Sequence, residues 1–166
     1  RDLPNAMKLQ EMRSVLNTYN APDYEDVANE GKGVFESLKT VSKSIIGASV
    51  EKIAQAYDPD NGGFGQAPKF PNPGVYELFL RHAAHSKSAR PLEMITHTLT
   101  RMARGGIYDH LGGGIARYST DTMWLVPHFE KMLYDQALVT GAYLDAYQKT
   151  GRADFAATAR GICDYV

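Results

Sequence analysis

The sequence predicts an all-α fold of antiparallel helical hairpins, because helical hydrophobic periods recur along the chain and no strand-like alternation is long enough to build a sheet. Val50, Ile53, Ala54 and Tyr57 follow the i, i+3, i+4, i+7 spacing of a one-sided helix. A similar apolar stripe runs through residues 94–102. Because turn-forming residues separate these stretches, consecutive helices are expected to pack as antiparallel neighbours.

Turn residues set the expected helix boundaries. The expected helices span residues 8–19, 24–57, 75–84, 89 or 91 to 103, 127–149 and 153–166. The second is interrupted around residues 31–33, has a further candidate break at Gly47, and stops at the turn over 58–63. Pro91 suits the first turn of its helix, and Pro127 is interpreted as the opening of the next one.

Residues 106–127 form an irregular, glycine-rich and aromatic segment between two expected helices. Residues 115–118 could make a short strand or one arm of a β-hairpin within it. An irregular stretch of this length inside a compact domain is typically functional rather than a simple connection. The segment is therefore the first place to look for a site.

Composition limits the classes of partner. The 166 residues have 43% hydrophobic side chains and a net charge of -1, so neither nucleic acid nor an anionic membrane is an expected partner. No apolar run approaches the ~20 residues that a membrane span needs. The single cysteine, Cys163, is expected to be a small buried hydrophobe and indicates a reducing, cytoplasmic location. Because Arg1 comes first, an upstream portion is expected to have been removed.

Several motif matches fail, so no metal and no cofactor is expected. The turn that begins at Asp58 resembles a calcium loop, but Gly62 and Lys69 stand where oxygen ligands are needed. The glycines at 112–114 lack the spacing of a dinucleotide-binding loop. His128 and Glu130 match the first part of a zinc deaminase motif whose cysteine pair is missing.

Polar and aromatic groups concentrate between residues 105 and 137, as in a carbohydrate pocket. Aromatic rings pack against sugar C–H surfaces, while carboxylates, arginine and histidine bond to hydroxyls. A structural role in turns and core accounts for about half of these residues. The candidate catalytic residues are His128, His110, Glu130 and Asp109. The candidate substrate-binding residues are Arg117, Tyr118, Trp124, Tyr108, Asp135 and Lys69.

The expected helix at Pro127 gives His128 and Glu130 a specific setting. Both would lie in its first turn, where the helix dipole favours a neutral imidazole that can act as a base. Asp135 would share the face of His128, ~10 Å further along the axis. Glu130 has two open interpretations, a carboxylate at a helix terminus or an acid–base and sugar-binding group.

Three long motifs, at residues 62–71, 102–114 and 117–135, resemble signatures of the YyaL-like thioredoxin-domain-containing family, which includes the spermatogenesis-associated thioredoxin-like proteins. The resemblance covers residues 45–166. It implies a thioredoxin-like domain followed by an (α/α)6 toroid of the six-hairpin glycosidase and N-acylglucosamine 2-epimerase type. This chain would then hold a connector over residues 1–44 and the first half of the toroid over 45–166.

Three functions are consistent with the residues and the resemblance. The first is a sugar epimerase or isomerase, in which His128 and either His110 or a group from the missing half move a proton. The second is a glycoside hydrolase that uses carboxylates from Asp109, Glu130 and Asp135. The third is a noncatalytic module that binds a ligand or partners the upstream thioredoxin-like domain. Apolar faces of an open toroid predict self-association, and the fragment alone is expected to be inactive.

Overall fold

A computed structural model describes residues 34–166 of the chain. The helix expected over residues 8–19, and the interruption expected around 31–33, lie outside these described residues. The chain divides into two units between residues 48 and 49, and the second unit, residues 49–166, is described throughout. Helix α2 (Val34–Ala54) begins in the first unit and ends in the second, and it runs without a break through Gly47. The candidate break at Gly47 is therefore wrong.

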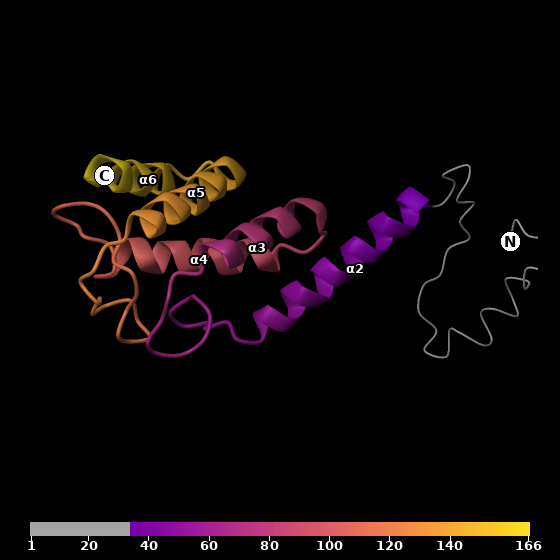
Figure 1. Cartoon of the computed structure of the whole chain (residues 1–166), viewed down its shortest axis with the longest axis horizontal. Helices are drawn as coiled ribbons and strands as arrows, with labels where there is room; N and C mark the ends of the chain where they lie inside the picture. Colours follow the sequence, from indigo (N-terminus) through magenta and orange to yellow (C-terminus); the bar gives the residue numbers. More distant parts are fainter. Residues whose placement is uncertain (1–33) are drawn as a thin grey trace, which may run out of the picture. The chain divides into compact units, whose positions relative to one another are not determined.

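The described residues are helical, with no named strand, so the predicted all-α class is confirmed. The helices α3 to α6 follow α2 along the chain (Figure 1). They are α3 (Pro73–His85), α4 (Arg90–Arg104), α5 (Leu133–Thr150) and α6 (Ala153–Tyr165). The helices expected over residues 75–84, 91–103 and 153–166 are confirmed to within one or two residues.

Helices of the second unit pack around one hydrophobic core. Helix α5 lies along α6, and α3 contacts both α4 and α5. Each helix gives this core its large apolar side chains. The fully buried ones include Tyr76, Phe79, Leu80, Ile95, Leu99, Met102, Tyr143, Phe155 and Ile162.

Helix α4 follows its sequence pattern closely. The predicted stripe of Met94, Ile95, Thr98, Leu99 and Met102 is buried throughout, while the charged residues Glu93, Arg101 and Arg104 are exposed. Because the stripe recurs with the helical period, burying it against α3 fixes the rotation of the helix about its axis.

The helix expected from Pro127 begins six residues later, at Leu133. Residues before it are extended, because their backbone groups bond to a neighbouring segment instead of to a helical turn. The amide of His128 donates to the carbonyl of Tyr118 at 2.9 Å, and Ser119 forms an isolated antiparallel bridge with Pro127. His128 and Glu130 are therefore not in the first turn of a helix, and the dipole argument for His128 does not apply.

The glycine-rich segment folds as turns held by isolated bridges rather than as a hairpin. Tyr108 pairs with Ile115, and Ser119 pairs with both Lys69 and Pro127. The strand expected over residues 115–118 is thus reduced to single bridges.

Cys163 is exposed, so its predicted burial is wrong. The buried face of α6 is set by Phe155, Ala159 and Ile162, and Cys163 lies about 100° around the helix from Ile162. Among the helices of residues 34–166, none is both long and apolar enough to cross a bilayer.

Candidate functional site

Three short extended segments lie side by side and form the base of the candidate site. The central segment, residues 117–120, pairs with Lys69 on one side and with residues 126–130 on the other. Lys69 and Ser119 exchange two backbone hydrogen bonds of 2.8 Å each. Arg117 donates its amide to the carbonyl of Glu130 at 2.8 Å, so sequence-distant residues are held in one register.

Phe70, Tyr118 and His128 form an aromatic ladder across these segments. The Phe70 and Tyr118 ring centroids are 4.6 Å apart with planes at 30°, and those of Tyr118 and His128 are 4.7 Å apart at 12°. The ladder follows from the register, because each ring is carried by a residue next to a bridged one. Phe70 is 40% exposed and His128 is also exposed, so the outer ring faces are open to solvent.

An ion pair lies beside the aromatic ladder. Arg117 Nη1 is 3.2 Å from Glu130 Oε2, and His128 Nδ1 is 3.8 Å from the same oxygen. The hydrogen bond to Glu130 raises the pKa of the Arg117 guanidinium. Since both partners are about two-fifths exposed, the pair contributes little to stability and mainly orients the two side chains.

Asp135 belongs to the same group through Arg117. It lies in the first turn of α5, and its Oδ2 atom is buried with no hydrogen-bond partner among the described residues. Burial raises the pKa of Asp135, and the negative charge of Glu130 adds to this, while the positive charge of Arg117 opposes it. The expected spacing of Asp135 from His128 along one helix does not apply, because His128 is not helical.

A second group of predicted residues surrounds a cavity of about 370 Å³. Tyr108, Asp109 and His110 line it together with Phe129 and Lys131. Phe129 and Lys131 alternate along the chain with His128 and Glu130, whose backbones bond to the central segment. In an extended segment, such alternating side chains point to opposite sides. His110 thus lies in this cavity and His128 in the aromatic ladder, so the two candidate histidines belong to different groups.

Asp109 and His110 are tied into the turn that carries them. Asp109 Oδ1 accepts hydrogen bonds of 2.9 Å from the amides of Leu111 and Gly112, and Oδ2 accepts one of 2.8 Å from Lys131. The bond from Gly112, together with those from Lys131 and Leu111, holds the pKa of Asp109 well below its usual range. His110 Nε2 donates to the carbonyl of Gly105 at 3.0 Å.

Lys69 and Trp124 are fully buried and do not face an open site. Lys69 Nζ donates to Asp58 Oδ2 at 2.6 Å, to the carbonyl of Gly62 at 2.8 Å and to that of Thr122 at 2.9 Å. The ammonium also lies 5.3 Å from the centroid of the Trp124 ring. Their positions give both residues a role in packing the loops.

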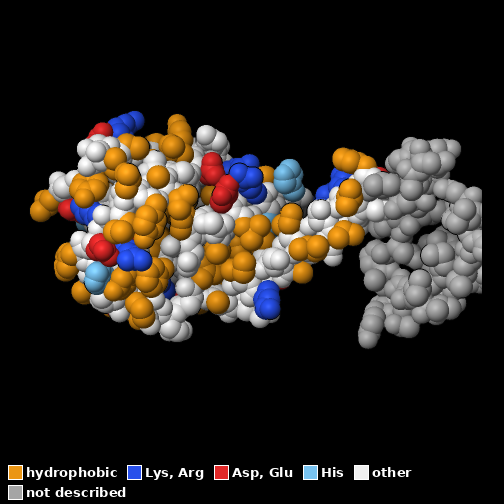
Figure 2. Space-filling view, in the orientation of Figure 1, with side chains coloured by type: hydrophobic (Ala, Val, Ile, Leu, Met, Phe, Trp, Pro, Cys, Tyr) orange, Lys and Arg blue, Asp and Glu red, His pale blue; other side chains and the backbone are white. Residues whose placement is uncertain are grey.

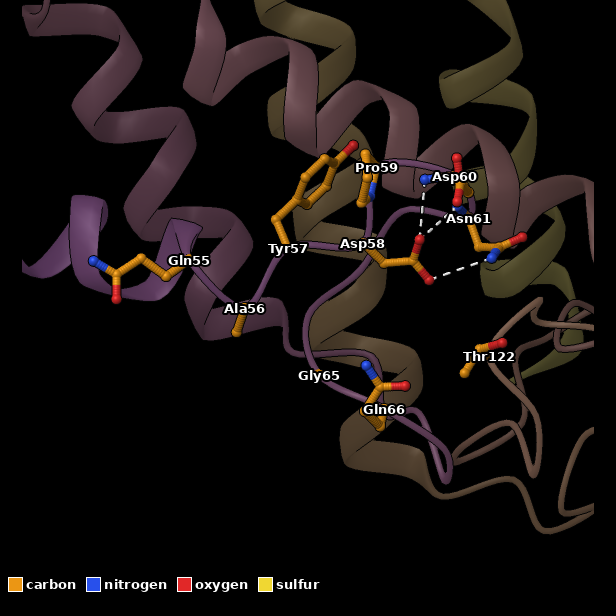
Figure 3. Close-up of a pocket in the computed structure, with 10 residues that line it drawn as sticks. All are labelled: Gln55, Ala56, Tyr57, Asp58, Pro59, Asp60, Asn61, Gly65, Gln66 and Thr122. Atoms are coloured by element: carbon orange, nitrogen blue, oxygen red, sulfur yellow. Dashed lines mark hydrogen bonds between the residues drawn. The ribbon is translucent and has the colours of Figure 1, made fainter.

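Asp58 borders a cavity of about 480 Å³ that the sequence did not predict (Figure 3). Its carboxylate accepts hydrogen bonds of 3.0 Å from the amides of Asp60 and Asn61, which shape the turn. Partial burial acts to raise the pKa of Asp58, but the hydrogen bonds from Lys69 and Asn61 outweigh it and lower the pKa to about 2. Across residues 34–166, no three His, Cys, Asp or Glu side chains are grouped as metal ligands.

Of the predicted site residues, the structure brings together Arg117, Tyr118, His128 and Glu130, with Asp135 close to Arg117. Phe70 completes the aromatic ladder and was not predicted as a site residue. The sequence signal for Phe70 is its position next to Lys69 in a proline-rich loop. In an extended segment, neighbouring side chains point to opposite sides.

Comparison with known proteins finds homologues but no matching family model. Spermatogenesis-associated protein 20 of Homo sapiens is 46% identical over 120 residues, which are 70% of this chain and 15% of that protein. The protein of the same name from Rattus norvegicus is 45% identical over the same length. An uncharacterized protein of Caenorhabditis elegans is 38% identical over 128 residues, 75% of this chain and 16% of its own length.

The chain therefore spans about 15% of the length of the curated relatives that it matches. The matched region is long and similar enough to indicate common ancestry with these proteins. The chain is therefore similar to one part of spermatogenesis-associated protein 20 from three mammals.

Proposed function

We propose that this chain supplies a carbohydrate-binding surface, with His128 as an acid–base group, to a sugar epimerase or isomerase of (α/α)6 type that also carries a thioredoxin-like domain. The observation that supports this most directly is the aromatic ladder beside the Arg117–Glu130 pair. It combines exposed ring faces with charged hydrogen-bonding groups, the two features that a sugar ring requires.

The chemistry of binding follows from the two parts of this surface. The outer faces of Phe70 and His128 offer flat apolar contacts to the C–H groups of a pyranose. The guanidinium of Arg117 donates to sugar oxygens, and the carboxylate of Glu130 accepts from hydroxyls. Because the two charged groups already orient each other, little side-chain freedom is lost when a ligand binds.

Epimerisation next to a carbonyl needs two acid–base groups on opposite faces of the carbon. His128 is the group offered here, with Glu130 Oε2 3.8 Å from its Nδ1 to orient the imidazole. His110 belongs to the separate cavity and is tied to Gly105, so we assign the second group to the remainder of the longer protein.

Deuterium exchange tests this function in the full-length protein that carries this sequence. With reducing sugars in D₂O, we expect deuterium at C2 of the product, and His128→Gln should slow its uptake by about 100-fold or more. His85→Gln, at an exposed histidine of α3, is the matched control and should leave uptake unchanged. Absence of uptake across a broad sugar panel contradicts the proposal.

Glycoside hydrolysis is the second candidate, and one observation favours it. Glu130 and Asp135 both interact with Arg117, and burial raises the pKa of Asp135 as a general acid requires. With aryl glycosides as substrates, Asp135→Asn should abolish release of the aryl group while sugar binding persists. If no aryl glycoside is cleaved by the unmodified full-length protein, this candidate is removed.

A further inference from the structure

Lys69 is a charged residue with no remaining capacity for a ligand. An ammonium has three N–H donors, and the three oxygen acceptors around Lys69 Nζ use all of them. The side chain is fully buried, and Asp58 supplies the single opposing carboxylate. A buried charge with complete partners is stable only while the partners stay in place.

The three acceptors come from parts of the chain that are far apart in sequence. Asp58 and Gly62 belong to the turn after α2, while Thr122 follows the central segment of the candidate site. Nζ therefore joins the turn over 58–62 to the loop around Thr122, which lies four residues after Tyr118.

The main chain of Lys69 also contacts the central segment of the candidate site. Its amide and carbonyl both bond to Ser119, the neighbour of Tyr118. Successive side chains of an extended segment point to opposite sides, so burial of Lys69 directs Phe70 onto the aromatic ladder. One residue thus sets the position of two adjacent rings.

We infer that Lys69 is a positioning residue for the carbohydrate surface, whose buried ammonium holds Phe70, Tyr118 and His128 in stacking register. This inference rests on the proposed function for its link to sugar binding. Its geometric part concerns only the aromatic ladder and can be measured without any sugar.

Proton NMR of His128 and sugar titrations test the inference in the full-length protein. Lys69→Met keeps an unbranched side chain, shorter by the terminal nitrogen, and removes its charge. We expect the ring protons of His128 to lose the shift caused by stacking on Tyr118 and to approach those of exposed His85. The affinity for glucose or another sugar that binds the wild type should fall about tenfold, because the rings are misplaced.

A double variant separates positioning from simple loss of stability. Lys69→Met leaves Asp58 without its cation, which can prevent folding. In Asp58→Asn with Lys69→Met no unpaired charge remains, so the protein should fold while the aromatic ladder stays displaced. Lys149→Met, at an exposed lysine of α5, is the matched control and should change nothing.

Each result decides the inference. If the His128 ring protons keep their wild-type chemical shifts in either folded variant, the inference is wrong. It is also wrong if those chemical shifts change while the sugar affinity does not. If the wild type binds no sugar at all, the proposed function fails, and the His128 shifts alone still decide whether Lys69 positions the aromatic ladder.

Discussion

Gly63 and Gly65 have nearly the same left-handed backbone but different surroundings. Their φ angles are 82° and 84°. A Cβ atom added at Gly63 would lie 2.5 Å from a ring carbon of buried Trp124, whereas one added at Gly65 would have nothing within 4 Å. The first glycine is thus needed for close approach as well as for its conformation, and the second for conformation alone.

Alanine substitutions separate these two requirements. Gly65→Ala should cost about 1 kcal/mol of unfolding free energy, from backbone strain alone. Gly63→Ala should cost roughly 3 kcal/mol, because the Trp124 ring must also move. Urea unfolding of both variants measures the difference, and equal losses would show that the Trp124 contact is unimportant.

Residue type alone did not show which of the predicted site residues lie together. Arg117, Tyr118, His128 and Glu130 were chosen for their functional groups, and the structure brings them together. Lys69 was chosen for the same reason, yet it is buried in a cage of oxygen atoms. One of its three acceptors, the carbonyl of Thr122, lies 53 residues away and gives no local sequence signal, so the cage could not be predicted.

Helices α4 and α5 illustrate why one element was predicted closely and the other was not. The stripe of α4 fixes both its type and its buried face. Helix α5 is apolar on several sides, and Pro127 supplied a plausible start for it. Pairing of residues 126–130 with the central segment overrides that local preference, so the helix begins at Leu133.

One buried hydrogen bond links these two helices. The hydroxyl of Tyr143 donates to the carbonyl of Leu99 at 2.9 Å. Tyr143→Phe keeps the ring and removes the donor, so it should cost about 1 kcal/mol of unfolding free energy. Tyr147→Phe, on an exposed position of the same helix, should cost nothing measurable, and thermal or urea unfolding can compare them. A loss as large for Tyr147→Phe would contradict this assignment.

The second unit carries hydrophobic side chains over its visible surface (Figure 2). On α5, Leu133, Leu138 and Leu144 are 68%, 57% and 43% exposed. At about 100° per residue, Leu133 and Leu144 lie on the same side of α5 and Leu138 lies on another, so together they give a broad apolar surface of the kind that is covered by another chain or domain. We propose that a second copy of this chain covers it when the chain is studied alone.

Sedimentation velocity tests this self-association. The wild-type chain should show a sedimentation coefficient that rises with concentration. Leu138→Glu combined with Leu144→Glu should suppress that rise, because two charges would have to be desolvated at the contact. Gln148→Glu adds a charge to an exposed position of the same helix and should have little effect. A clean monomer at every concentration in the wild type is the result that contradicts the proposal.

By itself, the sequence determined the all-α class, the course of α3, α4 and α6, and the region in which functional groups gather. Periodic apolar positions and turn residues act over a few residues, so they can be read without a structure. Only the tertiary structure decided that His128 and His110 belong to different groups, that Phe70 joins Tyr118, and that Lys69 is buried. Those outcomes depend on pairing between extended segments that are distant in sequence, where backbone hydrogen bonds to a neighbouring segment outweigh local helical preference.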